Sequence, residues 1–206
     1  MQNLNTGNFK IAAIISFIIA LMLFIASATV GRNDLFLLLN NNAGSFADSF
    51  FAAITWAGDG TVFIPALLII FFALKRKDVF PLLLGTFAIS TIIAQGVKNF
   101  LLPDQPRPTK AISDASLIHT VAGVDIHTIG SFPSGHTTTA FCIYFLFCLL
   151  LPKKWWIAVG LLYALLVGYS RVYLAQHFPV DVAGGIVAAI ISVYLSLKIQ
   201  QRLGKK

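Results

Sequence analysis

The sequence predicts an all-α integral membrane protein, a bundle of six transmembrane helices with both termini in the cytoplasm. Of the 206 residues, 57% are hydrophobic and only 11% are charged, whereas a soluble domain carries roughly 25% charged residues. The chain also contains six apolar runs near the ~20 residues that cross a bilayer. These runs leave no stretch for a soluble catalytic domain, so residues 1–206 are expected to form a single membrane domain.

The expected spans follow one another along the chain with short connections. Residues 11–30 form the first, and a signal peptide is the alternative because Ala26-Ser27-Ala28 resembles a cleavage site. The second, 61–74, is the weakest, because Gly58-Asp59-Gly60 separates it from the apolar run 50–57. Residues 43–51 are expected to form a short helix in the membrane interface. The remaining spans are 80–97, 136–151, 155–173 and 182–197.

The basic residues indicate which way the bundle faces. With six spans, ten of the fifteen basic residues share the side of the termini: Lys10, Lys75, Arg76, Lys77, Lys153, Lys154, Lys198, Arg202, Lys205 and Lys206. All acidic residues except Asp78 fall on the other side. The positive-inside rule therefore predicts cytoplasmic termini. The rule explains the net charge of +7, so no nucleic-acid partner is expected.

Polar residues that are costly near hydrocarbon gather in three clusters on the outward side. The first runs from Lys98 to Arg107-Pro108, at the end of the third span. The second is Pro133-Ser134-Gly135-His136, entering the fourth span, and the third runs from Ser170-Arg171 through His177 to Asp181. Because all three lie on the same predicted face of the membrane, they can meet in one site.

Such a site would suit phosphate chemistry. Lys98, Arg107 and Arg171 would supply three cations, and guanidinium groups pair bidentately with phosphate oxygens. The backbone N–H groups of Ser134 and Gly135 would lie at a helix N-terminus, which favours anions.

Two histidines in the same site indicate catalysis, with one as nucleophile and the other as acid. Asp181 follows His177 by four residues and can orient that ring on a helix. His177 is therefore the predicted nucleophile and His136 the predicted acid.

These clusters resemble the signature of the type 2 phosphatidic acid phosphatase superfamily. The motif-bearing region covers 98–181, and the second and third motifs match without a gap. The first has eight residues between Lys98 and Arg107, where the family usually has six. The resemblance implies that His177, His136 and Asp181 are catalytic. It implies phosphate binding by Lys98, Arg107, Arg171, Ser134 and Gly135, and neither a metal nor another cofactor.

By the same resemblance, the substrate is a bacterial lipid phosphate. Phosphatidylglycerol phosphate, phosphatidic acid, undecaprenyl diphosphate and a lipid A phosphate all remain open. The expected place is the bacterial cytoplasmic (inner) membrane, with the site facing the periplasm or exterior. The loop 109–131 is the expected place for lipid selectivity, because it joins two motifs.

Other interpretations remain open for several residues. Lys98 alone could snorkel at a span end, and the two arginines could anchor lipid headgroups. His119 and His127 are expected to be solvated loop residues, and Cys142 and Cys148 to be buried free thiols.

Two alternative functions also remain. A phosphotransferase would pass the phosphate to a second lipid instead of water. A lipid or anion transporter would carry its charges at the bilayer centre instead of one rim.

Overall fold

The computed structural model describes residues 4–203 and confirms the predicted all-α class. Across these residues, β-pairing is limited to one isolated bridge, between Pro106 and Ile129. The long helices are α1 (Thr6–Thr29), α5 (Phe80–Gly96), α7 (Gly135–Leu150), α8 (Trp155–Tyr173) and α9 (Pro179–Leu203). The shorter ones are α2 (Arg32–Leu39), α3 (Ser45–Ile54), α4 (Phe63–Leu68) and α6 (Pro108–Ala111). Single helical turns cover Thr55–Gly58, Gly60–Val62, Ile69–Ala73, Lys77–Val79, Val97–Leu101 and Ala115–Leu117.

Four helical stretches are long and apolar enough to cross a membrane: Thr6–Thr29, Lys77–Leu101, Trp155–Tyr173 and Pro179–Leu203. A fifth span results if Ser45–Gly58 and Gly60–Ala73, which meet at a bend of 58°, are counted together. Helix α7 is apolar but has only 16 residues. Within residues 4–203, length and composition thus support four or five candidate spans and leave the count of six open.

Helix α7 forms the core of the bundle. It packs against α1, α5, α8 and α9, and almost every residue from Thr137 to Leu149 is buried. Because neighbouring helices cover it, the three threonines at its start are shielded from lipid. Phe141, Tyr144 and Phe145 are the largest side chains that it buries. The helix therefore forms the centre of the bundle, and its first turn lies toward the end opposite the termini.

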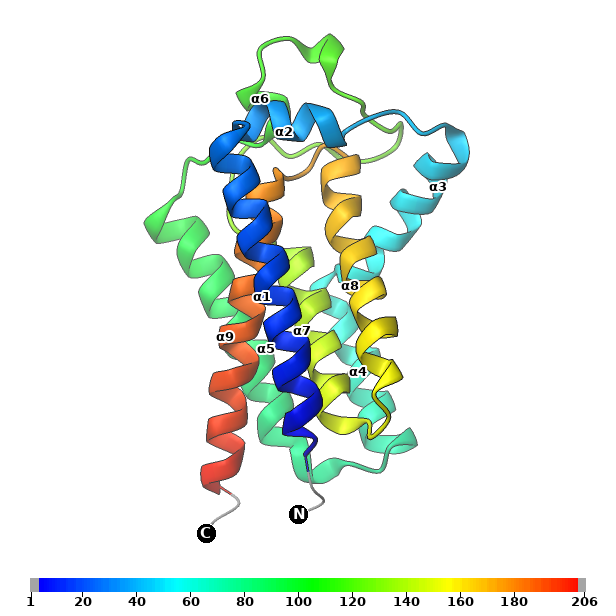
Figure 1. The fold of residues 1–206 in the computed structure, drawn as a ribbon, viewed down its shortest axis with the longest axis vertical. Coiled ribbons are helices and arrows are strands. Elements are labelled where there is room, and N and C mark those ends of the chain that lie inside the picture. The colour runs from blue at the N-terminus through cyan, green and yellow to red at the C-terminus, as the bar shows by residue number, and fades with distance from the viewer. Residues whose placement is uncertain (1–3, 204–206) are drawn as a thin grey trace.

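The two ends of the bundle differ in character. Figure 1 shows that α1 begins and α9 finishes at the same end, while α2, α6 and the loop between α5 and α7 lie at the other. At the terminal end, the Asn5 backbone N–H donates to the Leu149 carbonyl at 2.7 Å, and Asn8 Nδ2 donates to the Leu151 carbonyl at 3.3 Å. These bonds hold the start of α1 against the turn between α7 and α8.

The loop 102–134 is fixed to the helices beneath it. Asn40 Nδ2 lies 2.9–3.1 Å from the carbonyls of His119, Val172 and Tyr173. His119 Nε2 lies 2.9 Å from Asp48 Oδ1, which also accepts a bond from the Tyr173 hydroxyl at 2.6 Å. The His119 side chain is only 11% exposed. The prediction that His119 is a solvated loop residue is therefore wrong, because the ring packs between α3 and α8.

Candidate active site

The three polar clusters of the sequence converge at the end of the bundle opposite the termini. Lys98 lies in the turn Val97–Leu101 that extends α5, and Gly135 and His136 begin α7. The third cluster runs from the last turn of α8 across a short connection into α9, whose first residue is Pro179. Proline suits the first helical turn because its missing N–H would have no partner there. The convergence therefore depends on three helix ends and not on a flexible loop alone.

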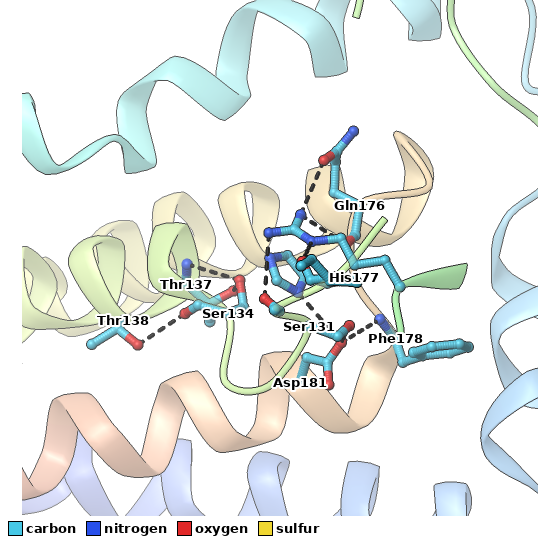
Figure 2. Close-up of polar contacts among 11 residues, drawn as sticks. Ser131, Ser134, Thr137, Thr138, Gln176, His177, Phe178 and Asp181 are labelled. Carbon is cyan, nitrogen blue, oxygen red and sulfur yellow. Dashed lines mark hydrogen bonds and ion pairs between the residues drawn. The ribbon is translucent and has the colours of Figure 1, made fainter. Parts of the chain in front are cut away.

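His177 and Asp181 form a buried pair at the junction of α8 and α9. His177 Nδ1 lies 3.3 Å from Asp181 Oδ2, and the same oxygen accepts bonds from the Ser131 hydroxyl at 2.5 Å and the Phe178 N–H at 2.9 Å. Figure 2 shows these three donors around one carboxylate. A proton on Nδ1 directed at the carboxylate leaves the lone pair of Nε2 available.

The start of α7 supplies backbone donors, and of the two that the sequence indicated, Ser134 and Gly135, the first is engaged within the protein. The Ser134 hydroxyl caps the helix by accepting from Thr137, and its carbonyl accepts from the Thr138 N–H at 3.0 Å (Figure 2). The Ser134 N–H donates to the Asp181 carbonyl at 3.0 Å. This N–H is therefore engaged within the protein. The N–H groups of Gly135 and His136, in the first turn of α7, remain for an anion.

A glycine in α9 lets this cap lie against the Asp181 helix. A Cβ built on Gly185 would lie 2.8 Å from the Ser134 carbonyl oxygen and 2.9 Å from Thr137 Cβ. Any larger residue would push α9 away from the first turn of α7. The small residue thus keeps the carboxylate and the helix start in register.

Arg107 is a buried cation that is held by the loop backbone. Its side chain donates to the carbonyls of Ile129 at 2.9 Å and Gly130 at 3.4 Å. Its Nη1 also lies 3.1 Å from both the backbone and the side-chain oxygen of Gln176. These bonds tie the first motif to the loop that precedes the second motif and to the third motif, and they fix the guanidinium beside His177.

Arg171 has fewer protein partners than Arg107. Its Nη1 donates to the Thr55 hydroxyl at 2.5 Å, and its buried Nε has no hydrogen-bond partner. An unpaired buried donor is costly, so Arg171 is ready for an acceptor such as phosphate. Lys98 lies within electrostatic reach of Arg107, Arg171 and Asp181. The structure therefore brings Lys98 to the other cations despite the longer spacing of its motif.

One cavity joins these groups to the apolar interior. It has a volume of about 750 Å³, and its polar end is lined by Lys98, Arg107, Gly135, His136, Arg171 and His177. Ser134 and Asp181 lie behind this lining. The apolar end is formed by Leu67, Ile70, Leu83, Leu84, Phe87 and Leu146. The cavity can therefore hold a charged group and an attached hydrocarbon chain at once.

Burial and charge set the protonation state at the His177 end. The pKa of His177 is held well below its usual value by burial, with Arg107 and Arg171 as the next causes. His177 is therefore neutral near pH 7, which is the form a nucleophile needs. Burial also lowers the pKa of Arg107, and Asp181 partly opposes this effect.

Several residues at this site carry little signal in the sequence. Ser131 and Gln176 contact the site only through bonds that the fold creates, at separations of 50 and 69 residues. His127 lies in the loop as expected but lines the cavity. Asp59 also lines the cavity, and its one signal in the sequence is the break it makes in an apolar run. Over residues 4–203, no group of three or more His, Cys, Asp or Glu side chains is arranged to hold a metal ion.

Comparison with known proteins identifies similar chains. The model of the PAP2 superfamily matches residues 80–205. An undecaprenyl-diphosphatase from Sulfolobus acidocaldarius is 31% identical over 175 residues, which cover 83% of this chain and 80% of that protein.

Two crystal structures share the fold. Aquifex aeolicus LpxE has a TM-score of 0.67 and 36% identity, over 80% of this chain and 93% of its own. The transmembrane PAP2 type phosphatidylglycerolphosphate phosphatase of Bacillus subtilis has a TM-score of 0.66 and 25% identity, over 92% and 96%.

Proposed function

Because this chain belongs to the PAP2 superfamily and is a membrane lipid phosphatase, we propose that it dephosphorylates a lipid phosphate or diphosphate through a phosphohistidine intermediate. One observation carries the proposal. The neutral His177, paired with Asp181, and three cations line one end of a cavity whose other end is apolar. Undecaprenyl diphosphate and phosphatidylglycerol phosphate are the first substrates to test, because similar proteins bear those names.

Phosphate binding falls to the three cations and the start of α7. Lys98, Arg107 and Arg171 neutralise the phosphoryl oxygens, and the free N–H groups of Gly135 and His136 add oriented donors. The unpaired Nε of Arg171 gains an acceptor when phosphate enters. Ser134 supports the site by capping α7, not by contacting the phosphate.

The chemistry is assigned to two histidines and one carboxylate. His177 Nε2 attacks phosphorus in line with the leaving oxygen, and His136 donates a proton to that oxygen. Asp181 stabilises the positive charge that develops on His177. In the return step, His136 takes a proton from the attacking water, the N–P bond breaks, and phosphate leaves.

The shape of the cavity favours a lipid over a soluble phosphate ester. Its apolar wall is formed by α4, α5 and α7, so a hydrocarbon chain can lie along these helices while the headgroup reaches His177. A water-soluble ester would leave this wall without a ligand. The cavity thus supports a lipid substrate without choosing the headgroup.

The site is also proposed to face outward. Residues 1–206 form one domain that crosses the membrane six times, with the bent pair and α7 counted as spans and the termini in the cytoplasm. The basic residues near the terminal end support this orientation. In a bacterial cytoplasmic membrane, the headgroup would then react at the periplasmic or exterior face.

The test is phosphate release from purified protein in detergent, with EDTA present. A panel of undecaprenyl diphosphate, phosphatidylglycerol phosphate, phosphatidic acid and a lipid A phosphate is expected to yield activity on at least one lipid. His177→Ala is expected to abolish release while the protein keeps its elution volume and helical content. A wild-type protein inactive on every lipid, or activity in His177→Ala, would contradict the assignment. Phosphate recovered on a second lipid would indicate a transferase.

A further inference from the structure

Asp59 is a carboxylate at the cavity that the mechanism above does not use. It lies at the break between the turns Thr55–Gly58 and Gly60–Val62, where the second apolar stretch bends by 58°. Asp59 and both flanking glycines line the cavity. Ionisable residues at membrane depth are costly and tend to serve function, and irregular backbone there is tolerated where it lines a polar cavity.

The break is fixed to α8 rather than being a loose hinge. The Tyr163 hydroxyl donates to the Ala57 carbonyl at 2.6 Å, and Arg171 donates to Thr55 on the preceding turn. Asp59 Oδ1 accepts from the Thr61 N–H at 2.8 Å. A carboxylate that accepts hydrogen bonds is stabilised in its charged form. The negative charge therefore has a defined place.

The same break lies against the start of α7 at His136. A Cβ built on Gly58 would lie 2.9 Å from the His136 carbonyl oxygen and 2.4 Å from Val167 Cγ1. Only glycine lets the break approach the start of α7 this closely. Asp59, the next residue, interacts electrostatically with both His136 and Arg171.

The charges around His136 are otherwise mostly positive. Arg171, Lys98 and Arg107 line the same cavity as His136, and Asp59 lines it as a carboxylate. Asp181 is occupied with Ser131, Phe178 and His177. Asp59 is thus the carboxylate that offsets the cations at His136.

We propose that Asp59 is a positioning residue whose carboxylate favours the protonated form of His136 as the lipid oxygen departs. The inference rests on the proposed phosphatase function. His177 Nε2 forms the N–P bond, the P–O bond to the lipid breaks, and its electron pair stays on the oxygen. That oxygen takes the proton of His136, which becomes neutral, while Asp59 remains a carboxylate throughout.

The experiment compares leaving groups in Asp59→Asn. An alkyl phosphate lipid needs a proton on the leaving oxygen, whereas p-nitrophenyl phosphate releases an acidic phenol that needs none. Positioned acids contribute about 10²–10⁴-fold. We expect kcat for the alkyl lipid to fall roughly tenfold to hundredfold, with the p-nitrophenyl rate within about twofold of wild type. The alkaline limb of the alkyl pH profile is expected to move to lower pH by about one unit, which corresponds to tenfold.

Matched variants isolate the charge from the fold. Asp104→Asn removes one negative charge from an exposed position of the first-motif loop and is expected to match wild type. Asp59→Glu retains the charge and is expected to keep more of the alkyl activity than Asp59→Asn. If Asp59→Asn does not elute as folded protein, Asp59→Ser is measured in the same way.

Two outcomes overturn the inference and leave the phosphatase function intact. One is an equal loss on both substrates, which indicates binding or folding. The other is wild-type behaviour on both. Absence of any wild-type phosphate release would instead refute the proposed function.

Discussion

The Ser131 hydroxyl offers a direct test of how Asp181 is held. It lies 2.5 Å from Asp181 Oδ2 and is 1% exposed. Ser131→Ala removes this donor and leaves the Phe178 N–H and the His177 ring on the same oxygen. A hydrogen bond to a charged group contributes about 1.5–3 kcal/mol. At 1.36 kcal/mol for each factor of ten, full loss of this orientation would lower kcat by roughly tenfold to hundredfold.

The assay is steady-state phosphate release by Ser131→Ala on the preferred lipid. KM is expected to change little, because an interaction that acts mainly in the transition state lowers kcat and kcat/KM together. Ser192→Ala is the matched control, since Ser192 is equally buried and its hydroxyl donates only to the Ala188 carbonyl within α9 at 2.7 Å. A kcat for Ser131→Ala within twofold of that control would refute the role of Ser131.

Three further predictions concern acid stability, chain length and the outward loop. The pKa of His177 is depressed in the folded protein. Below about pH 6.5, His177 therefore binds a proton in the unfolded state but not in the folded state. Stability is therefore expected to fall by up to about 1.4 kcal/mol per pH unit below that point. Thermal unfolding of His177→Asn in detergent should lose this part of the slope, and an unchanged slope would contradict it. Ile70 lies at the apolar end of the cavity. Ile70→Trp is expected to raise KM for long-chain lipids about tenfold, equivalent to ~1.4 kcal/mol, and to leave KM for a short-chain phosphate unchanged. Equal effects on both chain lengths would argue against binding of the lipid chain there. Asn40→Ala removes a donor shared by three carbonyls. It is expected to destabilise the protein by about 1–3 kcal/mol and to speed proteolysis within residues 102–134. An unchanged cleavage pattern would show that other contacts hold the loop.

The helices that the sequence located best are those defined by uninterrupted apolar length. The expected span 155–173 coincides with α8, and the expected starts of the third and fourth spans fall within one residue of α5 and α7. Helix α9 begins three residues earlier than expected, at Pro179, because its first turn carries the polar Asp181 and lacks an apolar pattern. Helix α2 was not expected, since eight residues beside asparagines show little periodicity.

The bend in the second span shows where apolar pattern stops being informative. Residues 43–51 were expected to form a short interfacial helix, and α3 covers most of this stretch; α3 also belongs to Ser45–Gly58, the first arm of a bent pair with Gly60–Ala73. The sequence marks the break at Gly58-Asp59-Gly60 without indicating that the two arms meet at 58°. That angle depends on the packing of Gly58 against α7 and α8, which are contacts with residues far along the chain.

The site was predictable as a set of residue types but not as a division of roles. Motif spacing indicated that Arg107 and Arg171 would bind phosphate, and it treated them alike. In the folded protein, Arg107 is surrounded by backbone and side-chain oxygens, whereas Arg171 has one hydroxyl partner and an unpaired Nε. Arg107 is therefore held by the loops, whereas Arg171 keeps an unpaired donor for the proposed phosphate. Such a distinction comes from long-range contacts, which spacing does not encode.

The excess of cations over carboxylates at the cavity explains how binding energy can contribute to the reaction. Lys98, Arg107 and Arg171 line the cavity, and within residues 4–203 the carboxylates that interact with them there are Asp59 and Asp181. Burial prevents water from screening these cations fully, so a bound phosphate would offset the repulsion among them. Negative charge on the equatorial oxygens must be neutralised as phosphoryl transfer proceeds. Cations that are already fixed in place need no reorganisation at that moment, and their stabilisation is therefore available to the transition state.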